Sequence, residues 1–139
     1  MMRFVFLLSV GLLPGLLGCG GRDSFLAVEG VVRLDAKPIE EGSIALTPLG
    51  AGRSAGAEIR GGRFAIEPRD GLAAGRYRVE ITAFEATGRK LVDEDLAGRE
   101  EAEFRQIIPQ RYNAMSTLEV MLEPQGDNRL EFELTGGSE

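Results

Sequence analysis

Residues 75–84 read GRYRVEITAF, and this stretch carries the clearest structural pattern in the chain. Tyr77, Val79 and Ile81 alternate with charged or polar residues, so an extended strand places all three side chains on one side. A helix would spread them around its circumference, because helical side chains repeat with a different period. The stretch therefore predicts a half-buried β-strand, with one face in a hydrophobic core and the other in solvent.

Six further stretches on both sides of this one also have the pattern of strands. The Gly61–Gly62 pair predicts a tight hairpin between two of them, because both turn residues must tolerate positive φ angles. Phe64 and Ile66 share one side of their strand and are expected in the core, while Gly30 marks a bulge or a close approach of backbone. The expected strands cover residues 25–34, 43–48, 55–60, 63–66, 75–84, 116–122 and 128–134.

Seven short strands with frequent turns and no long amphipathic helix predict an all-β fold, namely a seven-stranded antiparallel β-sandwich. The sandwich is expected over residues 26–135, with a frayed tail over 136–139. Inside it, residues 85–114 lack a clear pattern and are expected to form a long loop. A loop of that length indicates local structure or function. Within it, residues 100–106 are expected to form a helical turn or two.

Residues 1–18 have the composition of a secretory signal peptide. Arg3 supplies the positive charge, and the apolar run over residues 4–17 is too short to cross a bilayer. Pro14 and Gly15 would also interrupt the continuous helix of a membrane span. We therefore expect an export signal at this end of the chain.

The LLGC motif at residues 16–19 resembles the lipobox of bacterial lipoproteins, although Leu17 is bulkier than the small residue usual at that position. Cys19 is the only cysteine, so it has no partner for an intramolecular disulfide. Residues 19–25 are expected to form a flexible tether. The resemblance implies acylation of Cys19, with palmitate or similar chains, and a lipoprotein of the cell envelope that faces the periplasm or the exterior. The alternatives are a plain secretory signal and an uncleaved anchor.

The composition excludes several classes of function. The chain has 22 acidic and 16 basic residues, whereas nucleic-acid binding requires clustered lysine and arginine. The chain has no histidine, which excludes histidine-based acid–base catalysis, Ser-His-Asp triads and histidine-ligated zinc. We therefore expect a protein that is not an enzyme, that uses no cofactor and that binds no nucleic acid.

Acidic residues are densest between Asp93 and Glu103. Carboxylates of this kind bind Ca²⁺ in some loops, but the spacing lacks the pattern of a calcium loop. A glycosidase needs two carboxylates at a fixed separation across a cleft, which a mobile acidic loop does not indicate. The stretch is therefore interpreted as a solvated loop, and no metal site is predicted.

Several short motifs follow one another in an order typical of a known family. Residues 28–32 (VEGVV), 37–39 (KPI) and 42–44 (GSI) are followed by GRFAI at 62–66 and GRYRV at 75–79. In this order they resemble carboxypeptidase regulatory-like, or transthyretin-like, domains, with Ala36 in place of a common glycine. The IPQRYN and NRLEFEL segments, at residues 108–113 and 128–134, resemble the ending of small lipoproteins of the planctomycete type. The resemblance implies a prealbumin-like or immunoglobulin-like sandwich and no established reaction, since the related hydroxyisourate hydrolases use histidines.

Arg111 and Tyr112 are the candidate binding residues, as part of an interaction loop. The alternative for Tyr112 is structural, with its ring packed and its hydroxyl bonded to backbone. The function expected is a lipid-anchored envelope module with a structural or protein-interaction role, acting through strand edges or residues 85–114. The alternative is a module that binds envelope polysaccharide or a small ligand. The expected partners are thus the membrane, through Cys19, and an envelope protein or polysaccharide.

Overall fold

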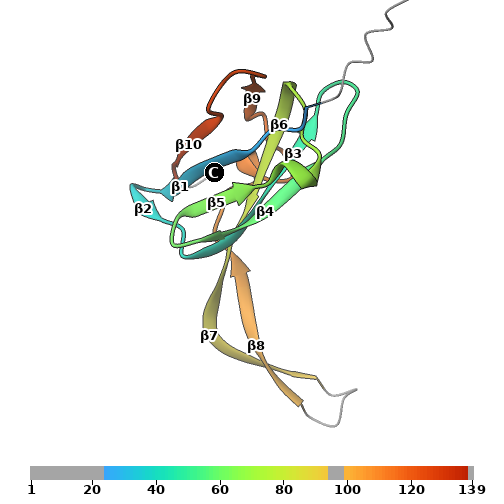
Figure 1. Cartoon of the computed structure of the whole chain (residues 1–139). Coiled ribbons are helices and arrows are strands. Elements are labelled where there is room, and N and C mark those ends of the chain that lie inside the picture. Colours follow the sequence, from blue (N-terminus) through green and yellow to red (C-terminus); the bar gives the residue numbers. More distant parts are fainter. Residues whose placement is uncertain (1–23, 94–98, 138–139) are drawn as a thin grey trace, which may run out of the picture.

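The computed structural model describes residues 24–93 and 99–137 (Figure 1). Within these ranges the chain forms β-strands and two 3-10 turns and no α-helix, so the predicted all-β fold is confirmed. None of the described residues belongs to a helix that is long and apolar enough to cross a membrane. The predictions for residues 1–18 and for Cys19 fall outside the described residues.

The ten strands within the described residues form two sheets. Eight of them build the body in the order β10-β1-β5-β4-β3-β6-β9, with β2 paired to β1, and this sheet curls into a half-barrel (Figure 1). The other two, β7 and β8, pair only with each other and project from the body as a ribbon. The strands are β1 (Val28–Leu34), β2 (Lys37–Pro38), β3 (Glu41–Pro48), β4 (Ala55–Arg60), β5 (Arg63–Ile66), β6 (Gly75–Thr82), β7 (Phe84–Asp93), β8 (Arg99–Gln106), β9 (Glu119–Leu122) and β10 (Arg129–Leu134), and the turns are η1 (Pro68–Asp70) and η3 (Gln110–Tyr112).

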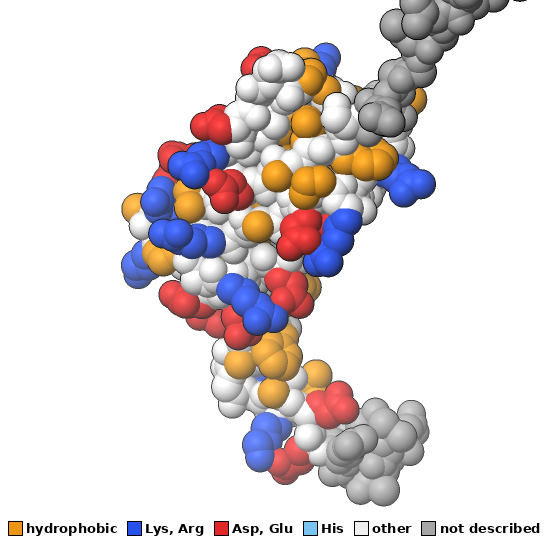
Figure 2. All heavy atoms as spheres, in the orientation of Figure 1, with side chains coloured by type: hydrophobic (Ala, Val, Ile, Leu, Met, Phe, Trp, Pro, Cys, Tyr) orange, Lys and Arg blue, Asp and Glu red, His pale blue; other side chains and the backbone are white. Residues whose placement is uncertain are grey.

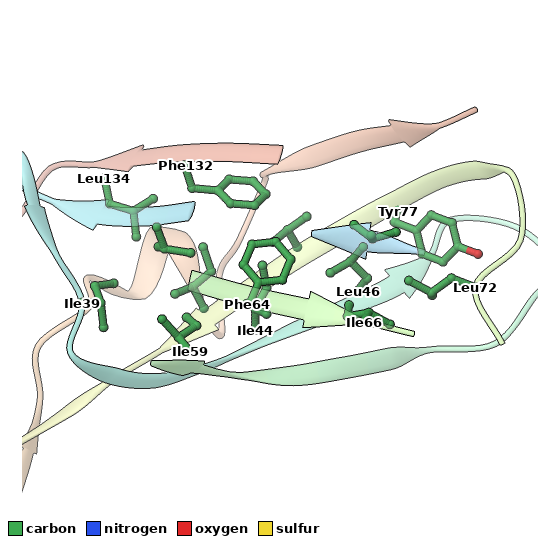
Figure 3. Packing of buried hydrophobic residues seen from close by; sticks show 14 of the residues in the cluster. Ile39, Ile44, Leu46, Ile59, Phe64, Ile66, Leu72, Tyr77, Phe132 and Leu134 are labelled. Carbon is green, nitrogen blue, oxygen red and sulfur yellow. The ribbon is translucent and has the colours of Figure 1, made fainter. Parts of the chain in front are cut away.

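The alternation read from residues 75–84 places three side chains of β6 in the core. Tyr77, Val79 and Ile81 are all buried, and β6 pairs with β3 so that Val79 lies opposite Leu46. Phe64 and Phe132 reach the same core from β5 and β10, and they point toward one another with ring centroids 6.3 Å apart (Figure 3). The predicted core positions of Phe64, Ile66 and Tyr77 are therefore confirmed.

Strand β1 lies between β5 and β10, and it pairs with β10 in parallel. This departs from the purely antiparallel arrangement expected from the sequence. At Gly30 the strands come so close that a Cβ would lie 2.2 Å from the carbonyl oxygen of Leu130. The expected close approach of backbone at Gly30 is confirmed, and so is the hairpin turn, where Gly61 and Gly62 have φ angles of 55° and 75°.

Residues 85–114 contain two strands and a 3-10 turn, in place of a long loop. The helical turn expected over residues 100–106 is wrong, because β8 covers them as a strand. The ribbon projects from the body, so its strands lack the buried apolar face that marks the other strands in the sequence. An irregularity in the register between Ala86 and Lys90 also breaks the period-2 alternation along β7.

Candidate interaction surface

The pairing of β7 with β8 gives the ribbon two unlike faces. Ala86 lies opposite Phe104, and Val92 lies opposite Glu100. Directly opposed residues in a strand pair have their side chains on the same face, so these pairs and the alternate pairs Phe84–Gln106 and Lys90–Ala102 define one surface. We call it the apolar face, and it consists of Phe84, Ala86, Lys90, Val92, Glu100, Ala102, Phe104 and, at its base, Gln106.

The apolar face is exposed to solvent. Phe84, Val92 and Phe104 have 58%, 59% and 62% of their surface accessible, which is unusual for side chains of this size. In Figure 2 hydrophobic side chains gather on the ribbon directly below the body. Contiguous exposed apolar surface of this kind is typical of sites where another molecule binds.

The charged residues of the ribbon are divided between its two faces. On the apolar face, Lys90 and Glu100 form an ion pair with 2.5 Å between Nζ and Oε2. The opposite face carries Glu101 and Glu103, and the Glu103 carboxylate accepts a hydrogen bond of 2.6 Å from the Thr87 hydroxyl. Of the acidic residues that the sequence places in a loop, Glu100, Glu101 and Glu103 thus lie on both faces of β8, while Glu94 and Asp95 fall outside the described residues.

The base of the ribbon is fixed to the core by a glutamine. The side-chain oxygen of Gln106 accepts hydrogen bonds from the backbone N–H groups of Ala83 and Ile108, at 3.0 and 3.1 Å. Ala83 and Ile108 are both buried. Ile107 adds a backbone hydrogen bond of 2.9 Å to the carbonyl of Ala83. These bonds set the direction in which the ribbon leaves the body.

A hollow of about 580 Å³ lies where the ribbon meets the body, and we call it the foot hollow. Phe84 and Phe104 line it from the ribbon, and Ile59 lines it from β4. Its remaining lining is mostly charged. The foot hollow is lined by Glu40, Glu41, Gly42, Glu58, Ile59, Arg60, Phe84 and Phe104.

A larger groove of about 860 Å³ lies on the body, over β10, β1, β5 and β4. It opens because β4 and β5 pair only at Arg60 and Arg63 and then diverge. Its lining holds three arginines and three glutamates, including an ion pair of 2.8 Å between Arg129 and Glu29. The one aromatic residue in this lining, Phe64, is buried. The groove therefore offers sugar rings no flat aromatic surface on which to stack.

Arg111 and Tyr112, the candidate binding residues from the sequence, hold the end of β10. Arg111 donates hydrogen bonds to the backbone carbonyl and the hydroxyl of Thr135, and its guanidinium lies 4.8 Å from the centre of the Tyr112 ring. The Tyr112 hydroxyl accepts a hydrogen bond of 3.3 Å from the Thr135 backbone N–H and lies 3.2 Å from the Thr135 hydroxyl. These are the contacts of the structural alternative for Tyr112, in which the ring packs and the hydroxyl bonds to backbone.

These contacts lower the pKa of Tyr112 to about 8. The largest cause is hydrogen bonding with the Thr135 side chain, followed by the Arg111 side chain and the Thr135 backbone. Hydrogen bonds donated to a phenolate, together with a nearby positive charge, favour the ionised form. The site therefore resembles a clamp on the C-terminal segment more closely than an open binding loop.

The residues that sequence reasoning missed are Phe84 and Phe104. Phe84 stands at the end of a predicted core strand, and Phe104 lies in an acidic segment expected to be a loop. The available signal was that two phenylalanines flank a mostly polar segment. Neither of them occupies a position that the predicted strands bury. Comparisons of the chain with protein-family models, with curated proteins and with solved structures find no match.

Proposed function

We propose that this protein is a lipid-anchored module of the cell envelope, and that it binds another protein through the apolar face of its β7–β8 ribbon. The observation that carries the proposal is the exposure of Phe84 and Phe104 on a ribbon that projects from the body. Burying a phenylalanine side chain contributes roughly 1.5–3 kcal/mol, so covering these half-exposed rings would contribute about 1–2 kcal/mol each.

The position of the ribbon supports this function. The described chain begins near the end of the body opposite the ribbon (Figure 1). If Cys19 carries the lipid that its motif implies, the ribbon points away from the membrane and toward other envelope components. The two halves of the curled body sheet enclose a single core, which supports the sandwich architecture and leaves the ribbon as a separate appendage.

The ribbon also offers backbone groups for binding. Among the described residues, β7 and β8 pair with no strand other than each other, so each keeps one free edge. A free strand edge binds an extended segment of another protein by continuing the sheet. Main-chain hydrogen bonds along the edge and apolar contacts on the face would then act together.

The test is crosslinking in intact cells followed by capture of the tagged full-length chain. The wild-type protein is expected to recover a specific envelope protein, and the variant Phe84→Ser/Phe104→Ser is expected to lose it. Leu91→Ser is the matched control, because Leu91 is 55% exposed on the opposite face of the same ribbon. Cys19→Ala tests whether the interaction depends on the anchor.

Two results would overturn the proposal. The first is recovery of the same protein in equal amount by the double serine variant, which would show that the apolar face does not bind it. The second is recovery of polysaccharide alone, which would point to the alternative function as a carbohydrate-binding module.

A further inference from the structure

We infer that the foot hollow receives a basic side chain, so that the protein bound by the ribbon presents lysine or arginine between apolar residues. This inference rests on the proposed function, because Phe84 and Phe104 belong both to the apolar face and to the foot hollow. The inference adds to the proposed function the residue types that the bound segment presents.

The charge of the foot hollow is the first observation. Glu40 and Glu41 form no ion pair within residues 24–93 and 99–137. The only basic residue in the lining is Arg60, whose Nε lies 3.0 Å from a carboxylate oxygen of Glu58. Arg60 pairs with Glu58 and also lies directly opposite Glu41 in the β3–β4 pair, so the lining holds three carboxylates and one guanidinium. The excess of negative charge can attract a cation.

The second observation is that the body fixes the backbone from which these carboxylates extend. Ile39 is buried, and the N–H of Gly61 donates a hydrogen bond of 2.9 Å to the carbonyl of Glu40. Next to them, a Cβ on Gly42 would lie 2.6 Å from the carbonyl oxygen of Thr82 at the end of β6. Since β7 follows β6 almost directly, the same closely packed backbone positions both the main chain of Glu40 and Glu41 and the base of the ribbon.

A basic side chain matches both parts of the lining. Its aliphatic stem packs on aromatic rings while its charged end reaches the carboxylates. A cation close to a phenylalanine ring is attracted by the ring as well. Other occupants fit less well, because a second copy of this chain has a net charge of −6 and an anionic lipid surface is also negative.

The test measures binding of two synthetic peptides to the full chain in detergent by fluorescence anisotropy. In one short peptide arginine alternates with valine, and in the other glutamate alternates with valine. We expect the arginine peptide to bind about tenfold more tightly, as two exposed charge pairs allow. The preference should decrease as salt is added, because the charges are near the surface.

Glu40→Gln/Glu41→Gln is the decisive variant, and it is expected to remove most of the preference. Glu123→Gln/Asp127→Asn is the matched control, because it removes the same charge from exposed positions between β9 and β10, away from the ribbon (Figure 1). The control should keep the full preference. If it loses the preference equally, net charge and not the foot hollow decides binding, and the inference is overturned.

The inference and the proposed function fail in different ways. Equal binding of the two peptides overturns the inference, even if Phe84→Ser/Phe104→Ser still loses its envelope protein in cells. Capture of that protein by the double serine variant overturns the proposed function, even if the isolated chain prefers the arginine peptide. Loss of the preference in Glu40→Gln/Glu41→Gln alone supports the inference.

Discussion

Gly30 lies on β1, between β10 and β5, and no other residue fits there without movement. An added Cβ would lie 2.2 Å from the Leu130 carbonyl oxygen and 2.8 Å from the ring of Phe64. We predict that Gly30→Ala lowers the free energy of unfolding by about 2 kcal/mol or more, because the backbone of β10 must shift. Urea unfolding measures this loss.

Gly50 provides the control for this prediction. A Cβ at Gly50 would meet no atom within 4 Å, so Gly50→Ala is expected to leave the unfolding midpoint nearly unchanged. If both substitutions have the same small effect, the close approach of β1 to β10 does not constrain residue 30.

Tyr112 gives a prediction about pH. Its pKa is lowered to about 8, so the folded state favours the phenolate more than the unfolded chain does. The contribution of Tyr112 to stability is therefore fully present above the ordinary tyrosine pKa, and it is lost as the pH falls through about 8. The ultraviolet absorbance of the phenolate should show a transition near pH 8 that is absent from Tyr112→Phe.

Thr135→Val separates the causes of this shift. It removes the side-chain hydrogen bond that contributes most to the shift, and it should move the transition toward higher pH. A transition at the ordinary tyrosine pKa in the wild-type protein would contradict the contacts of the clamp.

At the scale of elements, the ribbon depends on Gln106. Gln106→Ala leaves the N–H groups of Ala83 and Ile108 without their acceptor, in a place where both residues are buried. An unsatisfied buried donor costs about 1–3 kcal/mol, and we predict a loss of stability in this range. Hydrogen exchange of these two amides should accelerate as well. Gln106→Glu keeps an acceptor and should restore most of their protection, whereas equal exchange in all three proteins would contradict the role of Gln106.

Some strands could be predicted from the sequence and others could not, for a physical reason. Residues 55–60 and 63–66 were predicted as strands and form β4 and β5 with the same bounds, because burial of one face imposes the alternation and the glycines impose the turn. Residues 100–106 have no glycine turn and only a short alternation, in which Ala102 and Phe104 alternate with Glu101 and Glu103 but are not buried. Their strand β8 is formed by pairing with β7, which depends on where the chain returns and not on local preference.

At the scale of the whole molecule, the ribbon and the body have separate tasks. The core cluster contains residues of the body strands and their connections and excludes Phe84 and Phe104. We therefore predict that Phe84→Ser/Phe104→Ser changes the free energy of unfolding by no more than about 0.5 kcal/mol, as for other surface substitutions. Thermal unfolding of the purified variant measures this.

The substitution Phe64→Ser provides the contrast, because Phe64 is buried against Phe132. It is expected to destabilise the body by about 3 kcal/mol or more, through lost apolar contact and a buried hydroxyl. A comparably large loss in the double ribbon variant would mean that the ribbon rings pack on the body and are not free to bind.

The sequence by itself determined the all-β class, most strands of the body and the core positions of Phe64, Ile66, Tyr77, Val79 and Ile81, because alternation and glycine turns are local consequences of burying one strand face. It also pointed to Gly30 as a position of close approach. Only the tertiary structure decided that Arg111 and Tyr112 hold Thr135, that β1 runs parallel to β10, and that Phe84 and Phe104 share an exposed face. These features arise from the pairing of residues far apart in the chain, and a local pattern contains no information about such partners.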